Sequence, residues 1–158
     1  MVSIKWCWKN SKGLRIVQPN ENVSDSYLSM AEESIRALNK LKGVDIWSTT
    51  ITYYIFYYSL YSLMMRIGVK CEIHLCSLEF MKRFLSEFYD ERDVKMINKA
   101  FNARINLQYY PERPVDQKSL EEIKKYCKHF FIKTKDVLSL ITEDDISKLR
   151  KYLNDSVF

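Results

Sequence analysis

Glycine and proline are scarce in this chain, which has only three of each among its 158 residues. A sandwich or barrel of many short strands needs frequent turn residues, so this composition favours long helices instead. The length is that of one domain, and 47% apolar residues, with 14% aromatic, are enough to bury a substantial core. We predict one all-α domain spanning residues 1–158.

Cysteine pairs of the kind that bind zinc are also lacking. The cysteines are Cys7, Cys71, Cys76 and Cys127. They include no C-x-x-C pair, and their spacing to His74 and His129 matches no closed zinc pattern, so we expect no metal and no cofactor. The N-terminus has no apolar signal core, so we predict a cytoplasmic protein whose thiols are reduced and buried.

Charge of one sign is not concentrated anywhere. The 25 basic and 20 acidic residues give a net charge of +5, without a basic tail. Such a mild positive field permits an RNA partner but does not by itself indicate one.

The longest apolar stretch, "ITYYIFYYSLYSLMMRI" at residues 51–67, contains five tyrosines and two serines. Their hydroxyl groups would need hydrogen-bond partners in lipid, so we predict a helix buried in protein and no membrane span. Its apolar residues lie almost all the way round the helix. Because this exceeds what a small bundle normally hides, we predict a homodimer that buries part of the helix.

Helical periodicity and capping residues predict five main helices, preceded by an N-terminal arm. Residues 2–18 alternate in polarity and are interpreted as a β-hairpin or extended arm. The predicted helices begin at Ser24 or Asp25, near 46, near 72, after an Asp90 cap, and at a capping box of Ser119 with Glu122; a Thr142 and Asp145 box precedes a short final helix. Short connections favour antiparallel neighbours, so we expect an arm at residues 1–20 and an up-and-down bundle at 24–154.

Four segments together resemble an archaeal subgroup of the HEPN family of helical bundles. They are "KWCWK...GLRIVQPNEN" at the N-terminus, the tyrosine-rich stretch, "GVKCEIH" at the following turn, and "ARINLQYY" at residues 103–110. The resemblance covers roughly residues 4–135 and rests on the order and spacing of these motifs. It implies a homodimeric bundle of four or five helices, often encoded beside a small nucleotidyltransferase.

The resemblance also implies a candidate site at Arg104. Many members of the family are ribonucleases of toxin-antitoxin or defence systems, in which four to six residues separate an Arg from a catalytic His. Arg104 matches the first position, but Tyr109, Tyr110 and Pro111 stand where the His is expected. In some members a nearby tyrosine is modified with AMP, and Tyr109 or Tyr110 is the candidate here by analogy. The missing His predicts an incomplete nuclease site.

Two interpretations of Arg104 remain open. It shares a helical row with Ile97, Ala100, Phe101 and Gln108, where an arginine must be paired or face a wet cleft. A structural arginine would bond to carboxylates or carbonyls. A functional one would bind a phosphate in bidentate fashion, assisted by Asn102 or Gln108.

A replacement for the missing base is equally undecided. Metal-independent RNA cleavage needs an acid and a base with pKa values near neutrality, and tyrosine at about 10 is a poor substitute. His74 is either a packed histidine at a helix start or the base, and His129 has no partner residue predicted near it. Tyr109 and Tyr110 have two interpretations. Either they close the core with their hydroxyl groups hydrogen-bonded, or they stack on an RNA base or accept AMP.

Three functional hypotheses follow. The first is a homodimer that binds RNA or a nucleotide through Arg104, Asn102, Gln108 and Tyr110, with a small nucleotidyltransferase as a further partner. The second is a ribonuclease in which Arg104 stabilises the transition state and His74 or Tyr109 serves as the base. The third is a structural dimer without a ligand.

Overall fold

The computed structural model describes residues 2–114 and 116–157, and most of these residues are helical. The helices are α1 (Ile4–Lys9), α2 (Glu21–Lys40), α3 (Asp45–Ile67), α4 (His74–Phe84), α5 (Glu91–Tyr109), α6 (Gln117–Leu140) and α7 (Glu143–Val157). The strands β1 (Arg15–Ile16) and β2 (Val69–Lys70) form a small antiparallel sheet. The predicted all-α bundle is therefore confirmed.

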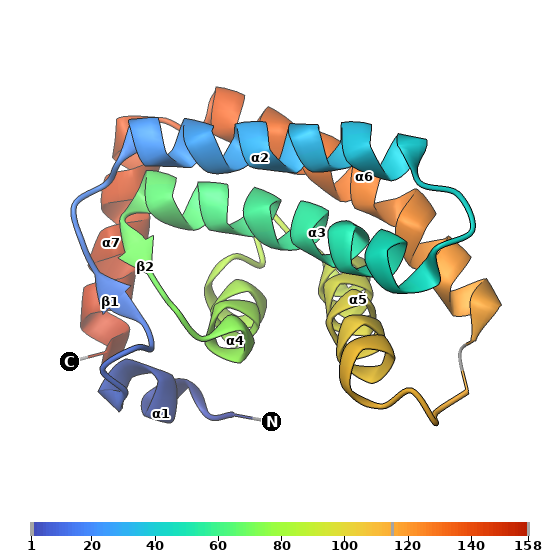
Figure 1. The fold of residues 1–158 in the computed structure, drawn as a ribbon. Helices are drawn as coiled ribbons and strands as arrows, with labels where there is room; N and C mark the ends of the chain where they lie inside the picture. Colours follow the sequence, from blue (N-terminus) through green and yellow to red (C-terminus); the bar gives the residue numbers. More distant parts are fainter. Residues whose placement is uncertain (1, 115, 158) are drawn as a thin grey trace.

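The bundle is built around α3 (Figure 1). Helix α3 packs against α2, α5 and α6, and most of its side chains are buried by these neighbours. Small residues bring α2 and α3 together, because the Ser62 hydroxyl donates to the Ser24 carbonyl over 2.8 Å. The central position predicted for this helix is thus correct, and its own chain covers more of it than the sequence suggested. Within residues 2–114 and 116–157, no helix is both long and apolar enough to cross a membrane.

The N-terminal segment differs from the predicted hairpin. Residues 4–9 form α1, whose start is capped by the Ser3 hydroxyl, and the alternating pattern instead places Ile4 and Cys7 on one buried face of a helix. Only the later part of the segment is extended. Its strand β1 pairs with β2, with Ile16 opposite Val69, and not with residues 4–9.

The cysteine prediction is wrong for one pair. Cys7 of α1 and Cys76 of α4 form a disulfide across a sequence separation of 69 residues. The sequence could not reveal this pair because only the return of the N-terminal segment to α4 brings the two residues together. Cys71 and Cys127 are free and buried, as predicted.

Two helix starts also lie earlier than predicted. Helix α2 is capped by Asn20, whose side chain accepts the Val23 N–H, and α6 is capped by Asp116. In both cases another capping residue lies a few positions upstream of the predicted one, so the helix gains an additional turn. The Asp90 cap of α5 and the Thr142–Asp145 box of α7 are confirmed, although α7 is longer than expected.

Candidate functional site

Arg104 lies in α5 with its guanidinium group against α3. Its Nε donates to the Gln108 side-chain carbonyl over 3.1 Å, and the Gln108 amide donates in turn to the Thr50 hydroxyl over 3.0 Å. The guanidinium carbon lies 5.2 Å from the Tyr53 ring centre and 5.4 Å from that of Tyr54. These contacts hold the planar group in place through one nitrogen and its π-face.

The charge of Arg104 has no carboxylate partner among the described residues. Every ion pair found there joins other side chains, and the two terminal Nη groups of Arg104 donate to no acceptor within residues 2–114 and 116–157. The side chain is only partly buried. An arginine held at Nε with both Nη groups free presents the donor fork that binds phosphate or carboxylate.

The structure brings His74 to the same place. Its Nδ1 lies 2.5 Å from the Tyr53 hydroxyl, and its ring stacks on that of Tyr57 with the centres 4.0 Å apart and the planes 4° apart. The imidazole and the guanidinium therefore contact the same tyrosine, Tyr53. His74 is the first residue of α4, so the α3–α4 turn and the packing of α5 on α3 create this cluster together.

The electrostatics of the cluster keep His74 neutral. Burial, with the positive charge of Arg104 as a second cause, lowers the pKa of His74 to about 4. Burial likewise raises the pKa of Tyr53 above its usual value. At neutral pH the imidazole is an acceptor or a weak base, and Arg104 is the cation of the pair that can meet an anion.

The stability of the protein is expected to fall as the pH drops from 6.5 toward 4. In this window the unfolded chain takes up a proton at His74 and the folded chain does not, so the stabilisation is complete above pH 6.5 and is lost in acid. We expect the loss to be about 2 kcal/mol, after allowing for partial exposure to solvent. Urea unfolding at several pH values, with His74→Gln and His129→Gln variants, measures it.

The Arg104→Gln variant supplies the matching control. Removing the neighbouring charge is expected to raise the pKa of His74 only part of the way toward 6.5, because burial is the larger cause. Since the chain has two histidines, NMR titration of the imidazole protons follows His74 with His129 as an internal reference. A His74 titration unchanged by the substitution would contradict the proximity of the two side chains.

The other predicted site residues lie apart from this cluster. Asn102 is two positions from Arg104, so it lies on a different face of α5, where it lines a small pocket with Arg113. Tyr109 is 64% exposed, and Tyr110 is covered on one face by the Arg113 guanidinium, 3.7 Å from its ring centre. Within the described residues neither tyrosine makes a hydrogen bond, an aromatic contact or a cation–π contact with Arg104 or His74. The structure therefore unites Arg104, Gln108 and His74.

Two members of the cluster, Tyr53 and Thr50, were not singled out from the sequence. The tyrosines of α3 were interpreted together as core or dimer packing, and Tyr53 is indeed fully buried. Its hydroxyl nevertheless links the ring system to His74. A signal was present, because Thr50, Tyr53 and Tyr57 follow the i, i+3, i+7 spacing of a single helix face.

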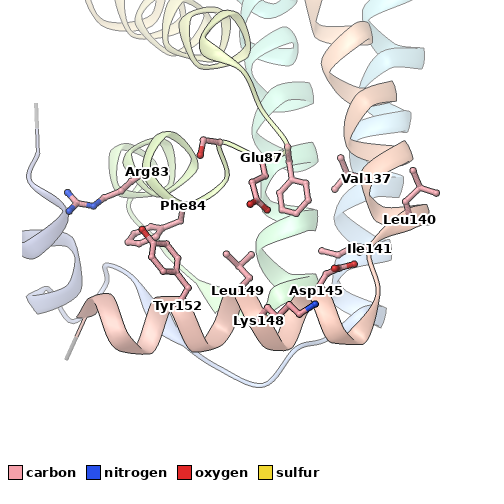
Figure 2. A pocket seen from close by; sticks show the side chains of 12 residues that line it. Arg83, Phe84, Glu87, Val137, Leu140, Ile141, Asp145, Lys148, Leu149 and Tyr152 are labelled. Atoms are coloured by element: carbon pink, nitrogen blue, oxygen red, sulfur yellow. The ribbon is translucent and has the colours of Figure 1, made fainter.

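A separate cavity lies elsewhere in the molecule, and neither Arg104 nor His74 lines it. A cavity of about 660 Å³ lies between the end of α4, the end of α6 and α7. Its walls are mainly apolar, with Phe84, Leu149 and Tyr152 on one side and Asp145 and Lys148 at the edge (Figure 2). The Arg104 cluster is therefore not part of this cavity.

No family model, no curated protein and no solved structure matches this chain. The resemblance to the HEPN family thus remains a prediction from the sequence motifs. Functional inference depends on the chemistry of Arg104 and its neighbours.

Proposed function

We propose that the protein is a HEPN-like homodimer that binds the phosphate of RNA or of a nucleotide at Arg104 and lacks a complete nuclease site. The resemblance adds a small nucleotidyltransferase as a partner and a toxin-antitoxin type system as the setting. The observation that carries the proposal is the free donor fork of Arg104, which has no carboxylate partner in the described part of the chain.

An anion would complete the arrangement around Arg104. Leaving a partly buried guanidinium without a counter-charge costs free energy, and a phosphate that accepts from both Nη groups recovers it. The Gln108 and Thr50 chain fixes the guanidinium before the ligand arrives, so little side-chain entropy is lost on binding. Because the pKa of His74 is lowered to about 4, its imidazole is uncharged at physiological pH and neither compensates the charge of Arg104 nor adds a second one.

A strip of α3 beside Arg104 supports the homodimer. Trp47, Ile51, Tyr54 and Tyr58 lie at helical spacing and are exposed or partly exposed, with Trp47 at 56%. The α3 sequence has no charged residue between Asp45 and Arg66, so two copies can pair through this strip without like-charge repulsion. Because the Arg104 guanidinium contacts Tyr54, the second copy would add a wall beside the arginine and form a cleft.

The alternative is a ribonuclease with a non-standard base. The nearness of His74 to Arg104 makes His74 the better candidate for that base than Tyr109. A pKa of about 4 lets His74 accept a proton at neutral pH only weakly, and its conjugate acid is scarce there. Tyr109 is 64% exposed, and no hydrogen bond or cation–π contact joins it to Arg104 among the described residues. These observations favour binding over cleavage.

The deciding experiment compares retardation and cleavage of labelled single-stranded and structured RNA in EDTA. The Arg104→Ala variant is expected to bind RNA roughly 10- to 100-fold more weakly, because hydrogen bonds to charged groups contribute about 1.5–3 kcal/mol. The slope of log affinity against log salt is expected to fall by about one. Light scattering of the same samples is expected to give twice the chain mass of 18.9 kDa.

Arg83→Ala is the matched control, because Arg83 is an exposed arginine that also has no ion-pair partner among the described residues. Equal losses of RNA affinity in the Arg83 and Arg104 variants would indicate a non-specific charge effect and overturn the site. RNA cleavage that requires both Arg104 and His74 would establish the ribonuclease. The absence of retardation and cleavage in the wild type would leave only a structural dimer.

A further inference from the structure

A groove of about 550 Å³ lies between the end of α2, the α2–α3 connection, the start of α3 and α6. Four lysines line it: Lys42, Lys124, Lys125 and Lys128. They come from two segments distant in sequence, since Lys42 follows α2 and the other three belong to α6. The fold therefore concentrates positive charge that is dispersed along the chain.

Most of this charge is not compensated by protein. Lys124 has two carboxylate neighbours, Asp45 at 3.7 Å and Glu121 at 3.5 Å. Lys128 donates to the neutral Asn39 side chain over 2.7 Å. Lys42 and Lys125 have no ion-pair or hydrogen-bond partner for their ammonium groups among the described residues and are exposed. Three of the four ammonium charges therefore have no carboxylate within ion-pairing distance in the described part of the chain.

Lysine charge converging on a concave surface matches a ligand that carries several linked negative charges. Ammonium groups on flexible stems bind phosphates as point charges without fixed geometry, so they suit a phosphate chain. The backbone N–H groups at the adjacent start of α3 add a weak field of the same sign, which the carboxylate of Asp45 in the first turn reduces. A neutral or cationic ligand would gain nothing from this surface.

The groove is separate from the Arg104 cluster. It includes Ser48 of α3, whereas Gln108 of the Arg104 cluster contacts Thr50. Two positions along an α-helix are separated by about 200° around its axis, so the two sites lie on different sides of α3. One can therefore be altered without removing a residue of the other.

We propose that this lysine groove is a second anion site, which binds linked phosphate groups such as those of a polyphosphate or a nucleic-acid backbone. Exposed Lys42, Lys125 and Lys128 supply the attraction. Lys124 is held by Asp45 and Glu121 and shapes the wall. The site does not depend on phosphate binding at Arg104.

The test is calorimetric titration of the whole protein with inorganic tripolyphosphate at low salt. Wild type is compared with a Lys42→Glu, Lys125→Glu double variant and with a Lys5→Glu, Lys12→Glu double variant. The latter changes the net charge equally, at exposed lysines in α1 and in the segment that follows it. Helix α1 lies on the opposite side of the molecule from the α2–α3 connection (Figure 1). We expect saturable binding that weakens at least 10-fold in the groove variant and less than about 3-fold in the control.

Two results would overturn the proposal: no saturable binding of tripolyphosphate to wild type, or equal weakening in both double variants. Circular dichroism and thermal unfolding show whether each variant is folded. Should the groove variant fail to fold, Lys42→Gln with Lys125→Gln removes the same positive charges without adding negative ones. The expected weakening is then smaller but still larger than that of the corresponding control.

Two further measurements identify the source of the phosphates and distinguish binding at the groove from binding at Arg104. If the groove variant also weakens binding of a short single-stranded RNA, the phosphates are those of a nucleic-acid backbone; if RNA binding is unchanged, they belong to a free polyphosphate. Either result supports the groove. Arg104→Ala is expected to leave tripolyphosphate binding at the groove intact, so failure at Arg104 and failure at the groove give different patterns.

Discussion

Replacing Lys133 with methionine is expected to lower the free energy of unfolding by about 3–5 kcal/mol. Lys133 of α6 lies 2.5 Å from the carboxylate of Asp93, which is fully buried at the start of α5. The same carboxylate accepts from the Tyr126 hydroxyl and from the Asp90 backbone N–H, each over 2.9 Å. The methionine keeps the apolar stem but leaves a buried carboxylate without its cation. Urea unfolding at neutral pH measures the loss.

Two further variants test whether the buried charge is the cause. Asp93→Asn in the Lys133→Met background removes the uncompensated charge and keeps one oxygen acceptor, so it is expected to recover much of the lost stability. Lys148→Met breaks an exposed pair with Asp144 and is expected to leave the stability nearly unchanged. A double variant no more stable than Lys133→Met alone would show that packing, and not charge, explains the loss.

The helices could be predicted because their signals are local. Asp90 and Gly68 stand at the ends of strongly periodic segments, and the structure ends α3 at Gly68 and begins α5 directly after Asp90. The first residue of a helix was harder to predict where two possible capping residues lie close together in the sequence. Asn20 lies upstream of Ser24, and the helix extends to the first cap because each added turn forms further backbone hydrogen bonds.

The N-terminal segment shows why a short alternating pattern misleads. Ile4, Trp6 and Trp8 alternate with polar residues, as in a strand, but Ile4 and Cys7 are also three apart, as on a helix face. Tertiary contacts select the helix. Cys7 is buried against α4 and bonded to Cys76, and no local signal marks a partner 69 residues away.

About half of the Arg104 cluster was within reach of the sequence. Arg104 and Gln108 are four residues apart on one helix, so their hydrogen bond follows from helical geometry. His74 and Tyr53 come from other helices, and their meeting depends on how α4 and α5 pack on α3. Asn102 was grouped with Arg104 by closeness in sequence, although two positions along a helix point to different faces.

Replacing Gly68 with alanine is expected to lower the free energy of unfolding by about 2–5 kcal/mol. Gly68 caps α3 with φ of 78°, a left-handed conformation that costs about 1–2 kcal/mol for a residue with a Cβ. The Cβ would also lie well inside van der Waals distance of the Val17 carbonyl oxygen and the Arg150 guanidinium. Relieving such overpacking costs a further 1–3 kcal/mol or so.

The contact is severe because Gly68 lies where three segments meet. The Val17 N–H donates to the Gly68 carbonyl over 2.9 Å, which ties the segment after β1 to the end of α3. Arg150 of α7 donates to the carbonyls of Val17 and Ile67, over 2.9 Å and 2.8 Å. The Arg150 side chain can move aside, but the Val17 carbonyl belongs to the backbone and cannot move without breaking these hydrogen bonds.

Gly43→Ala is the matched control for Gly68→Ala. Gly43 has a similar φ of 70°, but a Cβ there would meet no atom within 4 Å. It therefore measures the cost of the left-handed conformation alone, expected to be about 1 kcal/mol. Chemical denaturation of both variants separates the two contributions. If both substitutions lower the free energy of unfolding equally, the residues around Gly68 can shift to accept the Cβ at little cost. Close packing at Gly68 would then not be what holds β1, α3 and α7 together.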